Sequence, residues 1–196
     1  MGPGGVYVNH HIKVLDRVQL PLAADVKRAI RAQTQKAIGV TVGVEAAHRA
    51  VQVREADWLL HACTAGIAED VSINTCGTYG IASAAYWWGR LAAIIHRALF
   101  HITGPSLPLW ALLFADDWSL SAGGPNFVAT LLIAIWAMPV FKVTVSWPTC
   151  PGWKRLIGVG YELNFEELTL GISDRRASWL LGWLLAYLGV RSGIDS

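Results

Sequence analysis

Charged side chains are scarce in this chain of 196 residues, of which Asp, Glu, Lys and Arg together make up 15%. The formal net charge is only +2, whereas a dedicated nucleic-acid-binding domain usually concentrates basic residues on one face. This balance permits a nucleic-acid partner without indicating one. Because 54% of the residues are hydrophobic, the chain can bury a core of ordinary size, which excludes a disordered segment.

Cysteine is also scarce, since the chain holds only Cys63, Cys76 and Cys150. Their number is odd, and their spacing forms neither a Cys-x-x-Cys pair nor a Cys/His metal motif. A disulfide scaffold is therefore not indicated. The pattern favours a reduced intracellular location, either the nucleus or the cytoplasm.

Long apolar runs are absent as well, although the mean hydropathy is +0.40. The best candidate for a membrane span, residues 127–141, is interrupted by Thr130 and Pro139. It is shorter than the ~18–20 residues that a bilayer crossing requires. No charged segment followed by an apolar one marks a signal peptide at the start. No membrane association is expected, and a small membrane protein is kept as an alternative.

Hydrophobic periodicity predicts an α+β fold, because helices and strands mix without strict βαβ alternation. Glycine- and proline-containing stretches separate the segments. Helices are predicted over residues 22–37, 81–100, 127–137 and 173–188, and strands over residues 38–42, 59–64, 71–75, 109–115, 118–121, 143–145, 156–163 and 169–170.

Two adjacent carboxylates, Asp116 and Asp117, end the apolar segment 109–115. Neighbouring carboxylates repel each other, and such a pair at the end of a buried strand suits a divalent cation such as Mg²⁺. Aspartate is also a common turn residue, and the pair alone is better explained by a polar turn between two strands. The dipeptide by itself leaves both interpretations open.

Three motifs in order along the chain resemble the palm of a reverse transcriptase of the eukaryotic retroelement type. Residues 114–117, Phe-Ala-Asp-Asp, match that family's aromatic-x-Asp-Asp box, which lies in a β-hairpin. Residues 78–86 resemble its loop-helix motif, with Gly80 at the family's glycine. Residues 158–163 resemble the hairpin that holds the primer end. The likeness covers residues 38–188 and favours the metal-binding interpretation of the aspartate pair.

The resemblance implies a right-hand polymerase palm, in which an antiparallel sheet with the Asp-Asp hairpin packs on two long apolar helices. Residues 1–37 would be an N-terminal extension and helix left from the fingers. Residues 38–172 would be the palm, and residues 173–196 the start of a thumb helix and a tail. The implied function is RNA-directed DNA polymerase activity, by two-metal nucleotidyl transfer in the ancestor of a retrotransposon fragment.

The resemblance also implies site residues, taken position by position. Asp116 and Asp117 would be catalytic and would hold Mg²⁺ or Mn²⁺. The implied partners are an RNA or DNA template-primer and deoxynucleoside triphosphates, and His48 falls at the gate that excludes ribonucleotides. The residues implied in nucleotide binding are Val44, Glu45, Ala47, His48 and Gly80, and those implied in primer binding are Gly158, Gly160 and Tyr161.

One departure from the family pattern bears directly on activity. The family's first metal-binding aspartate falls on Gly43. Glu45, two residues along the same predicted strand, and Asp25, in a competing register, are the alternatives for the missing carboxylate. Pro148 stands in the stretch where the family has a lysine near the leaving pyrophosphate. We therefore expect a degenerate enzyme with little or no synthesis, and keep a non-catalytic nucleic-acid-binding remnant as an alternative.

Overall fold

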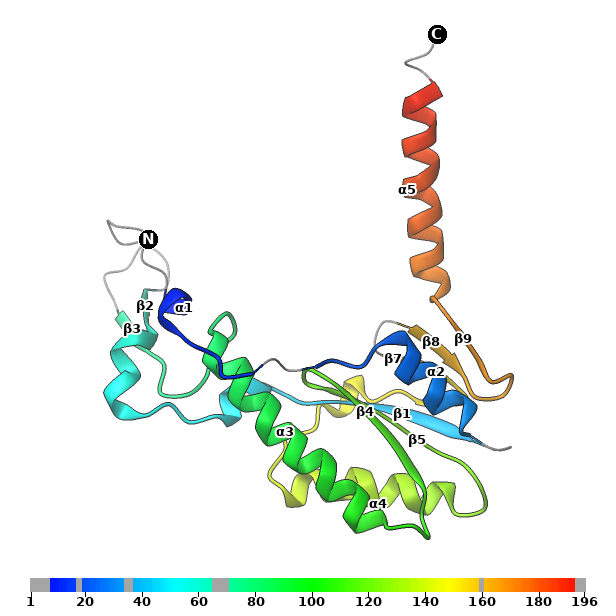
Figure 1. Ribbon diagram of the computed structural model, residues 1–196, viewed down its shortest axis with the longest axis horizontal. Coiled ribbons are helices and arrows are strands. Elements are labelled where there is room, and N and C mark those ends of the chain that lie inside the picture. Colours follow the sequence, from blue (N-terminus) through cyan, green and yellow to red (C-terminus); the bar gives the residue numbers. More distant parts are fainter. Residues whose placement is uncertain (1–7, 17–18, 34–36, 65–70, 159–160, 193–196) are drawn as a thin grey trace.

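The computed structural model describes residues 8–16, 19–33, 37–64, 71–158 and 161–192 (Figure 1). Its centre is an antiparallel four-stranded sheet with the order β4-β5-β1-β6. The predicted strand at 38–42 and the predicted hairpin are both confirmed. The strands are β1 (Ile38–Gly43), β4 (Leu109–Phe114), β5 (Asp117–Ala122) and β6 (Gly152–Trp153).

Alternation along β1 and β5 gives this sheet one apolar face. Val40, Val42, Trp118 and Leu120 are all buried there, because successive side chains of a strand point to opposite sides. Two helices, α3 (Ala82–Thr103) and α4 (Phe127–Val140), cover that face (Figure 1). Complete burial of each large apolar side chain contributes about 1.5–3 kcal/mol, so this layer holds the sheet in place.

The expectation of two long apolar helices is only partly met. Helix α4 is apolar but has 14 residues. Helix α3 has 22 residues but carries Arg90, His96 and Arg97, because only one of its faces meets the core. No helix in the part of the chain that the structure describes is both long and apolar enough to cross a membrane.

A second, smaller layer covers part of the other face of the sheet. It consists of α2 (Ala23–Arg31) and a three-stranded sheet of β7 (Arg155–Gly158), β8 (Tyr161–Asn164) and β9 (Thr169–Gly171). Its core holds side chains from α2, β7, β8 and the residue that follows β8: Val26, Ile30, Leu156, Leu163 and Phe165.

Glycine allows the two layers to approach closely. A Cβ at Gly39 of β1 would overlap the ring of Phe165, and a Cβ at Gly158 of β7 would come within 2.5 Å of Ser119 Oγ. Thr41, between Gly39 and Gly43 on the same face of β1, donates a 3.4 Å hydrogen bond to the carbonyl of Ile157.

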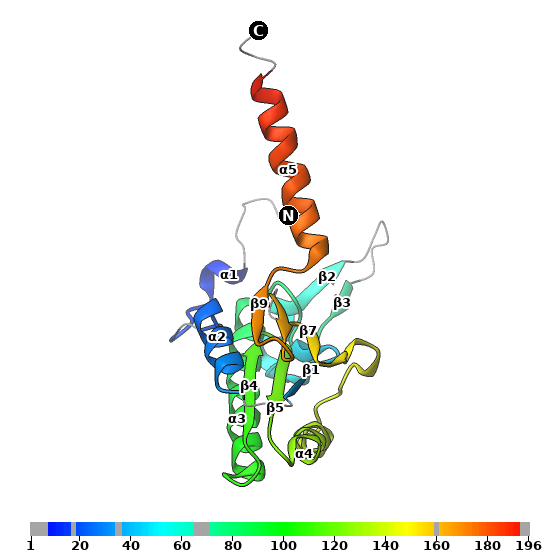
Figure 2. The same cartoon turned by 90° about the vertical axis from the view of Figure 1, so that its right-hand side faces the viewer.

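The remaining elements form a small lobe at one end and a projecting helix at the other. The lobe contains α1 (Val8–His11), the 3₁₀ helices η1 (Ala47–Ala50) and η2 (Glu55–His61), and the hairpin of β2 (Ala62–Thr64) and β3 (Val71–Ile73). Helix α5 (Asp174–Ser192) stands away from the body (Figures 1 and 2). Its large apolar side chains from Trp179 to Leu188 are exposed. A third 3₁₀ helix, η3 (Trp147–Thr149), precedes β6.

Four predicted elements differ from the structure. The helix predicted over 22–37 ends at Arg31, and the strand predicted over 59–64 begins at Ala62 because η2 takes up its first residues. The segment 156–163, predicted as one strand, contains parts of β7 and β8, which pair as the hairpin that the motif implied. Residues 143–145 contribute a single bridge, between Val145 and Val44, rather than a strand.

Candidate functional site at the aspartate hairpin

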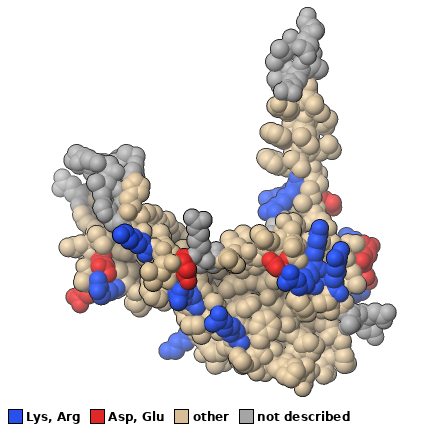
Figure 3. Space-filling model, in the orientation of Figure 1, with Lys and Arg blue, Asp and Glu red and all other residues tan. Residues whose placement is uncertain are grey.

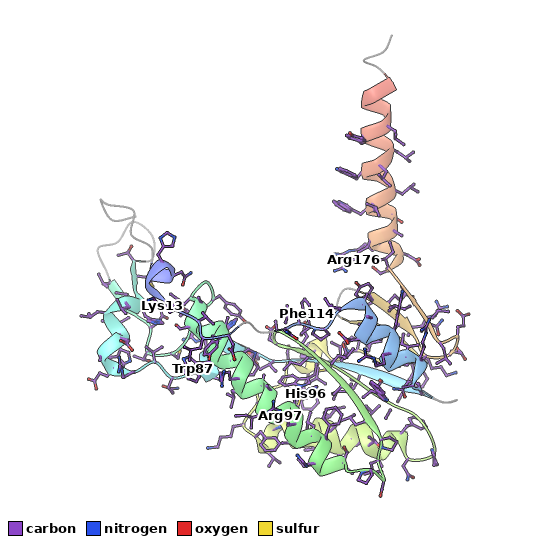
Figure 4. All side chains as sticks on the ribbon, in the orientation of Figure 1. Lys13, Trp87, His96, Arg97, Phe114 and Arg176 are labelled. Carbon is purple, nitrogen blue, oxygen red and sulfur yellow. The ribbon has the colours of Figure 1, made fainter. Side chains whose placement is uncertain are left out.

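The aspartate pair lies at the tip of the β4–β5 hairpin. Phe114 pairs with Asp117, so Ala115 and Asp116 form a two-residue turn. Ala115 has φ +55°, a left-handed conformation that costs a residue with a Cβ roughly 1–2 kcal/mol. The indole N–H of the buried Trp88 donates a 3.1 Å hydrogen bond to the Ala115 carbonyl, which helps to hold this turn. Figure 4 shows Phe114 at the same end of the hairpin.

The surroundings of Asp117 disfavour its charged form. Burial, and then the neighbouring Asp116 carboxylate, raise the pKa of Asp117 above its ordinary value. Asp117 is nevertheless an exposed residue, so solvent screens much of this effect. A cation at this tip would relieve the repulsion.

Gly43 is the residue that lies directly opposite Asp117 across the β1–β5 pair. Residues opposite each other in an antiparallel pair have Cα atoms ~4.5–5.5 Å apart and point to the same face. The Val44 N–H donates a 3.1 Å hydrogen bond to the Asp116 carbonyl, which fixes this register. A side chain at position 43 would therefore project beside Asp117.

A thiol that the sequence did not indicate lies near this position. Burial raises the pKa of Cys150, a hydrogen bond with the Gly43 backbone opposes that rise, and the Asp117 charge adds to it. The thiol donates a 3.2 Å hydrogen bond to the Ser146 carbonyl. A thiol held protonated in this way is a poor metal ligand. The spacing of the three cysteines gave no signal for this contact, because it depends on η3 folding back over the end of β1.

Neither alternative carboxylate joins the pair. Glu45 follows the strand in a turn, and its N–H is bonded to the Thr144 carbonyl at 2.8 Å. The strand geometry that would align it with Gly43 ends there, because Ala46 has φ +51°. The Asp25 carboxylate belongs to α2, where it accepts a 2.9 Å hydrogen bond from the Leu22 N–H.

The carboxylates at the hairpin tip are too few for a metal centre. Among the described residues, no group of three or more His, Cys, Asp or Glu side chains could hold a metal ion. Two-metal phosphoryl transfer needs two ions about 3.5–4 Å apart, held by shared carboxylates. Asp116 and Asp117 alone do not fit such a centre.

The residues predicted to bind nucleotide occupy different environments. Val44 and Ala47 are buried in the core beneath α3, and Glu45 is exposed. His48 is half-buried, with its ring edge-on to Tyr79 at 4.4 Å between centroids. Gly80 is exposed with φ +87°, a conformation that suits glycine.

An asparagine from the N-terminal lobe fixes the start of α3 beside Gly80. The Asn9 amide donates a 2.6 Å hydrogen bond to the Gly80 carbonyl. The oxygen of the same amide accepts one from the Ala82 N–H at 2.9 Å. The contact joins residues distant in sequence, so no local capping signal predicted it.

The predicted primer-binding hairpin lies on the same face of the central sheet as Asp117. Gly158 ends β7 and pairs with Tyr161, the first residue of β8. Gly158 is buried against Ser119 of β5, and Tyr161 is half-buried. Gly160 lies outside the described residues.

Some of the basic side chains lie on α2 and α5. Figure 3 shows Lys and Arg over the region of α2 and at the foot of α5, and Figure 4 places Arg176 at that foot. Arg90, by contrast, is satisfied within the chain, since it pairs with Asp16 at 3.1 Å. Trp88 is buried, whereas its neighbour Trp87 is 55% exposed and does not belong to the core.

The sequence matches no protein-family model and no curated protein. Solved structures do match it. Foamy virus protease-reverse transcriptase in complex with double-stranded DNA gives a TM-score of 0.62 at 12% identity, over 86% of this chain and 27% of the other. The native prototype foamy virus protease-reverse transcriptase gives 0.59 at 16% identity, over 83% and 20%. Telomerase from Candida albicans, in complex with a fragment of telomeric RNA, gives 0.58 at 8% identity, over 79% and 34%.

These likenesses show a reverse-transcriptase-like fold. The resemblance drawn from the ordered motifs is thus confirmed at the level of the fold. The chain spans between 20% and 34% of the length of these three proteins.

Proposed function

We propose that this chain is the palm of a reverse-transcriptase-like protein that binds template-primer and transfers nucleotides poorly or not at all. One observation carries the proposal: Gly43 lies opposite Asp117, at the position where the metal centre of such a palm needs a carboxylate. Loss of several kcal/mol of transition-state stabilisation would slow transfer severely, because each ~1.4 kcal/mol is tenfold in rate.

The retained carboxylates would be the metal-binding part of the site. Asp116 and Asp117 are the residues that would contact Mg²⁺ or Mn²⁺, whose role when bound in such palms is to activate a hydroxyl and stabilise a leaving oxygen. The pair lacks the third carboxylate, so we assign it weak metal binding and no reaction step.

The other proposed roles follow the arrangement of the fold. His48 and Gly80 would border an incoming nucleotide, and Gly158 with Tyr161 would support a primer end. The N-terminal residues 1–37 would be what is left of the fingers, residues 38–172 the palm, and residues 173–196 the start of a thumb. The foot of α5, with Arg175 and Arg176, would contact phosphates beside the primer.

Binding is tested with a fluorescent RNA/DNA primer-template, measured by anisotropy at increasing salt. We expect an affinity that falls steeply with salt, because phosphate contacts release counterions. Reversing both charges at the foot of α5, Arg175→Glu with Arg176→Glu, is expected to weaken binding at least tenfold. Lys142→Gln, at the end of α4, is the control and is expected to leave binding unchanged.

Catalysis is tested on the same primer-template with deoxynucleoside triphosphates and either Mg²⁺ or Mn²⁺. We expect no primer extension above background. Extension that disappears in Asp116→Ala would contradict the proposed deficiency while keeping the polymerase assignment. Absent or salt-independent binding would contradict the nucleic-acid function itself.

A further inference from the structure

Helix α4 turns one apolar side outward, away from the core. None of its 14 residues is charged, and Figures 1 and 2 show no described element beyond α4 on this side. A helix that is apolar all round is normally buried, so we expect this side to have a partner. Four side chains at four-residue spacing lie on it and are each at least 50% exposed: Val128, Leu132, Trp136 and Val140.

The apolar surface continues from α4 onto α3. Leu91 of α3 and Phe141, at the end of α4, line one hollow between the two helices. The exposed residues that we call the α4 face are Leu91, Ile94, Val128, Leu132, Ile133, Trp136, Val140 and Phe141. Their exposed fractions leave roughly 700 Å² of apolar surface open. Apolar patches of more than a few hundred Å² mark interaction sites.

The size and the charge of the α4 face fit a second copy of this chain. A standard protein–protein interface buries about 800 Å² on each partner, and the α4 face supplies nearly that area. A two-fold pair brings the same patch of both copies together, and an uncharged helix brings no like charges into contact. A lipid surface fits less well, because helices that lie on lipid are rich in Lys and Arg and α4 has neither.

The shape of α4 is complementary to itself in one orientation. Trp136 and Ala129 are both exposed, and seven residues are close to two helical turns, so the two share a side. In a parallel pair the two indoles would meet and the two alanines would face empty space. In an antiparallel pair each indole would lie against an alanine, and large against small is the arrangement that fills an interface.

We propose that α4 pairs with α4 of a second copy in antiparallel orientation. Leu132 and Ile133 lie near the two-fold axis, and each Trp136 packs against the partner's Ala129. This pairing is independent of the proposed function. Helix α4 covers the apolar face of the central sheet, whereas Asp117 lies on the other face, so the dimer needs neither a metal nor nucleic acid and can form where the primer-template experiments fail.

Sedimentation velocity of the full chain over a range of concentrations tests the pairing. We expect a concentration-dependent species of twice the 21.3 kDa of one chain. Trp136→Arg is expected to weaken dimerisation at least hundredfold, because both copies lose an aromatic anchor at the centre of the interface. Trp179→Arg on α5 is the matched control, since Trp179 is 70% exposed and Trp136 is 68% exposed. It should leave the dimer unchanged, and thermal unfolding checks that each variant is folded.

An exchange of the large and the small residue tests the orientation. Trp136→Ala and Ala129→Trp are each expected to weaken dimerisation at least tenfold, the first by leaving a gap and the second by a clash. The variant with both substitutions is expected to regain most of the lost affinity. Trp136→Ala with Val128→Trp, which adds the same bulk one residue away, is the control and should not regain it.

Four results would overturn the inference. A chain that stays monomeric at every concentration would show that the α4 face does not pair. Binding of that monomer to phosphatidylcholine vesicles would assign the face to lipid instead. A dimer that survives Trp136→Arg, or is lost in Trp179→Arg, would place the interface elsewhere. If both single exchanges weaken the dimer and the double variant regains nothing, the antiparallel orientation is wrong.

Discussion

The two ends of β1 carry the same residue type for different reasons. Gly39 and Gly43 point to the same face of the sheet, since they are an even number of residues apart. At Gly39 the ring of Phe165 takes the space of a side chain. At Gly43 the neighbour across the sheet is Asp117, and under the proposed function this is the position of a missing metal-binding carboxylate.

Gly39 and Gly43 therefore have different roles in the same strand. Gly39, together with Gly158, lets the β7–β9 layer lie on the central sheet, and this contact positions the hairpin predicted to hold a primer. Gly43 is also buried, and it lies opposite Asp117 with Cys150 beside its backbone. The reverse-transcriptase-like fold is thus retained around the position where the proposed function expects a carboxylate.

The largest effect on stability is expected at Gly39, where β1 packs against Phe165. Gly39→Ala is expected to lower the free energy of unfolding by about 1–3 kcal/mol, the usual cost of overpacking a filled core. Gly171→Ala on β9 is the matched control, because a Cβ there meets nothing within 4 Å. Urea unfolding measures both. Equal stability of the two variants would contradict the role assigned to Phe165.

A double-mutant cycle tests the contact between Gly158 and Ser119. Gly158→Ala is expected to cost about 1–2 kcal/mol, because its Cβ would lie 2.5 Å from Ser119 Oγ. Ser119→Ala alone should be neutral or slightly stabilising, since that buried hydroxyl has no hydrogen-bond partner. The double variant should recover most of the loss in urea unfolding. Purely additive losses would show that the clash is not with Ser119.

The smallest effect on stability is expected at Asp117, opposite Gly43. Because the pKa of Asp117 is raised in the folded chain, the folded state holds the proton more tightly than the unfolded state. Stability therefore falls as pH rises from about 3.8 through the raised pKa. Asp117→Asn removes this loss and is expected to stabilise the protein at pH 7 by a few tenths of a kcal/mol, after discounting for solvent screening.

The same urea unfolding of Asp117→Asn and the unchanged protein at pH 3 serves as the control. At pH 3 the carboxyl is protonated in both states, so Asp117→Asn and the unchanged protein should unfold at the same urea concentration. A gain at pH 3 equal to that at pH 7 would mean that the effect is not electrostatic.

The parts of this fold that depend on local pattern could be predicted from the sequence. Short β-branched content predicted β1, an apolar run before the aspartate pair predicted the β4–β5 hairpin, and the apolar run after Gly80 predicted the start of α3 within one residue. The register that aligns Gly43 with the aspartate box followed from the motif order. Its alternative, Asp25, fails because that residue lies in a helix rather than a strand.

Other parts of the site depend on contacts that no local pattern records. Glu45 leaves the strand because the chain turns at Ala46, where the backbone is left-handed. Cys150 reaches Gly43 only through η3, and Asn9 reaches the start of α3 only through the N-terminal lobe.

The most direct test of the central claim is Mn²⁺ binding by Gly43→Asp, measured by electron paramagnetic resonance. Gly43→Asn, similar in size and uncharged, is the matched control. The proposal predicts that Gly43→Asp binds Mn²⁺ at least tenfold more tightly than either Gly43→Asn or the unchanged chain, and that adding Asp117→Asn removes the gain. Thermal unfolding checks that each protein is folded. Equal Mn²⁺ affinity in all three proteins would contradict the assignment of Gly43 as the missing metal-binding position.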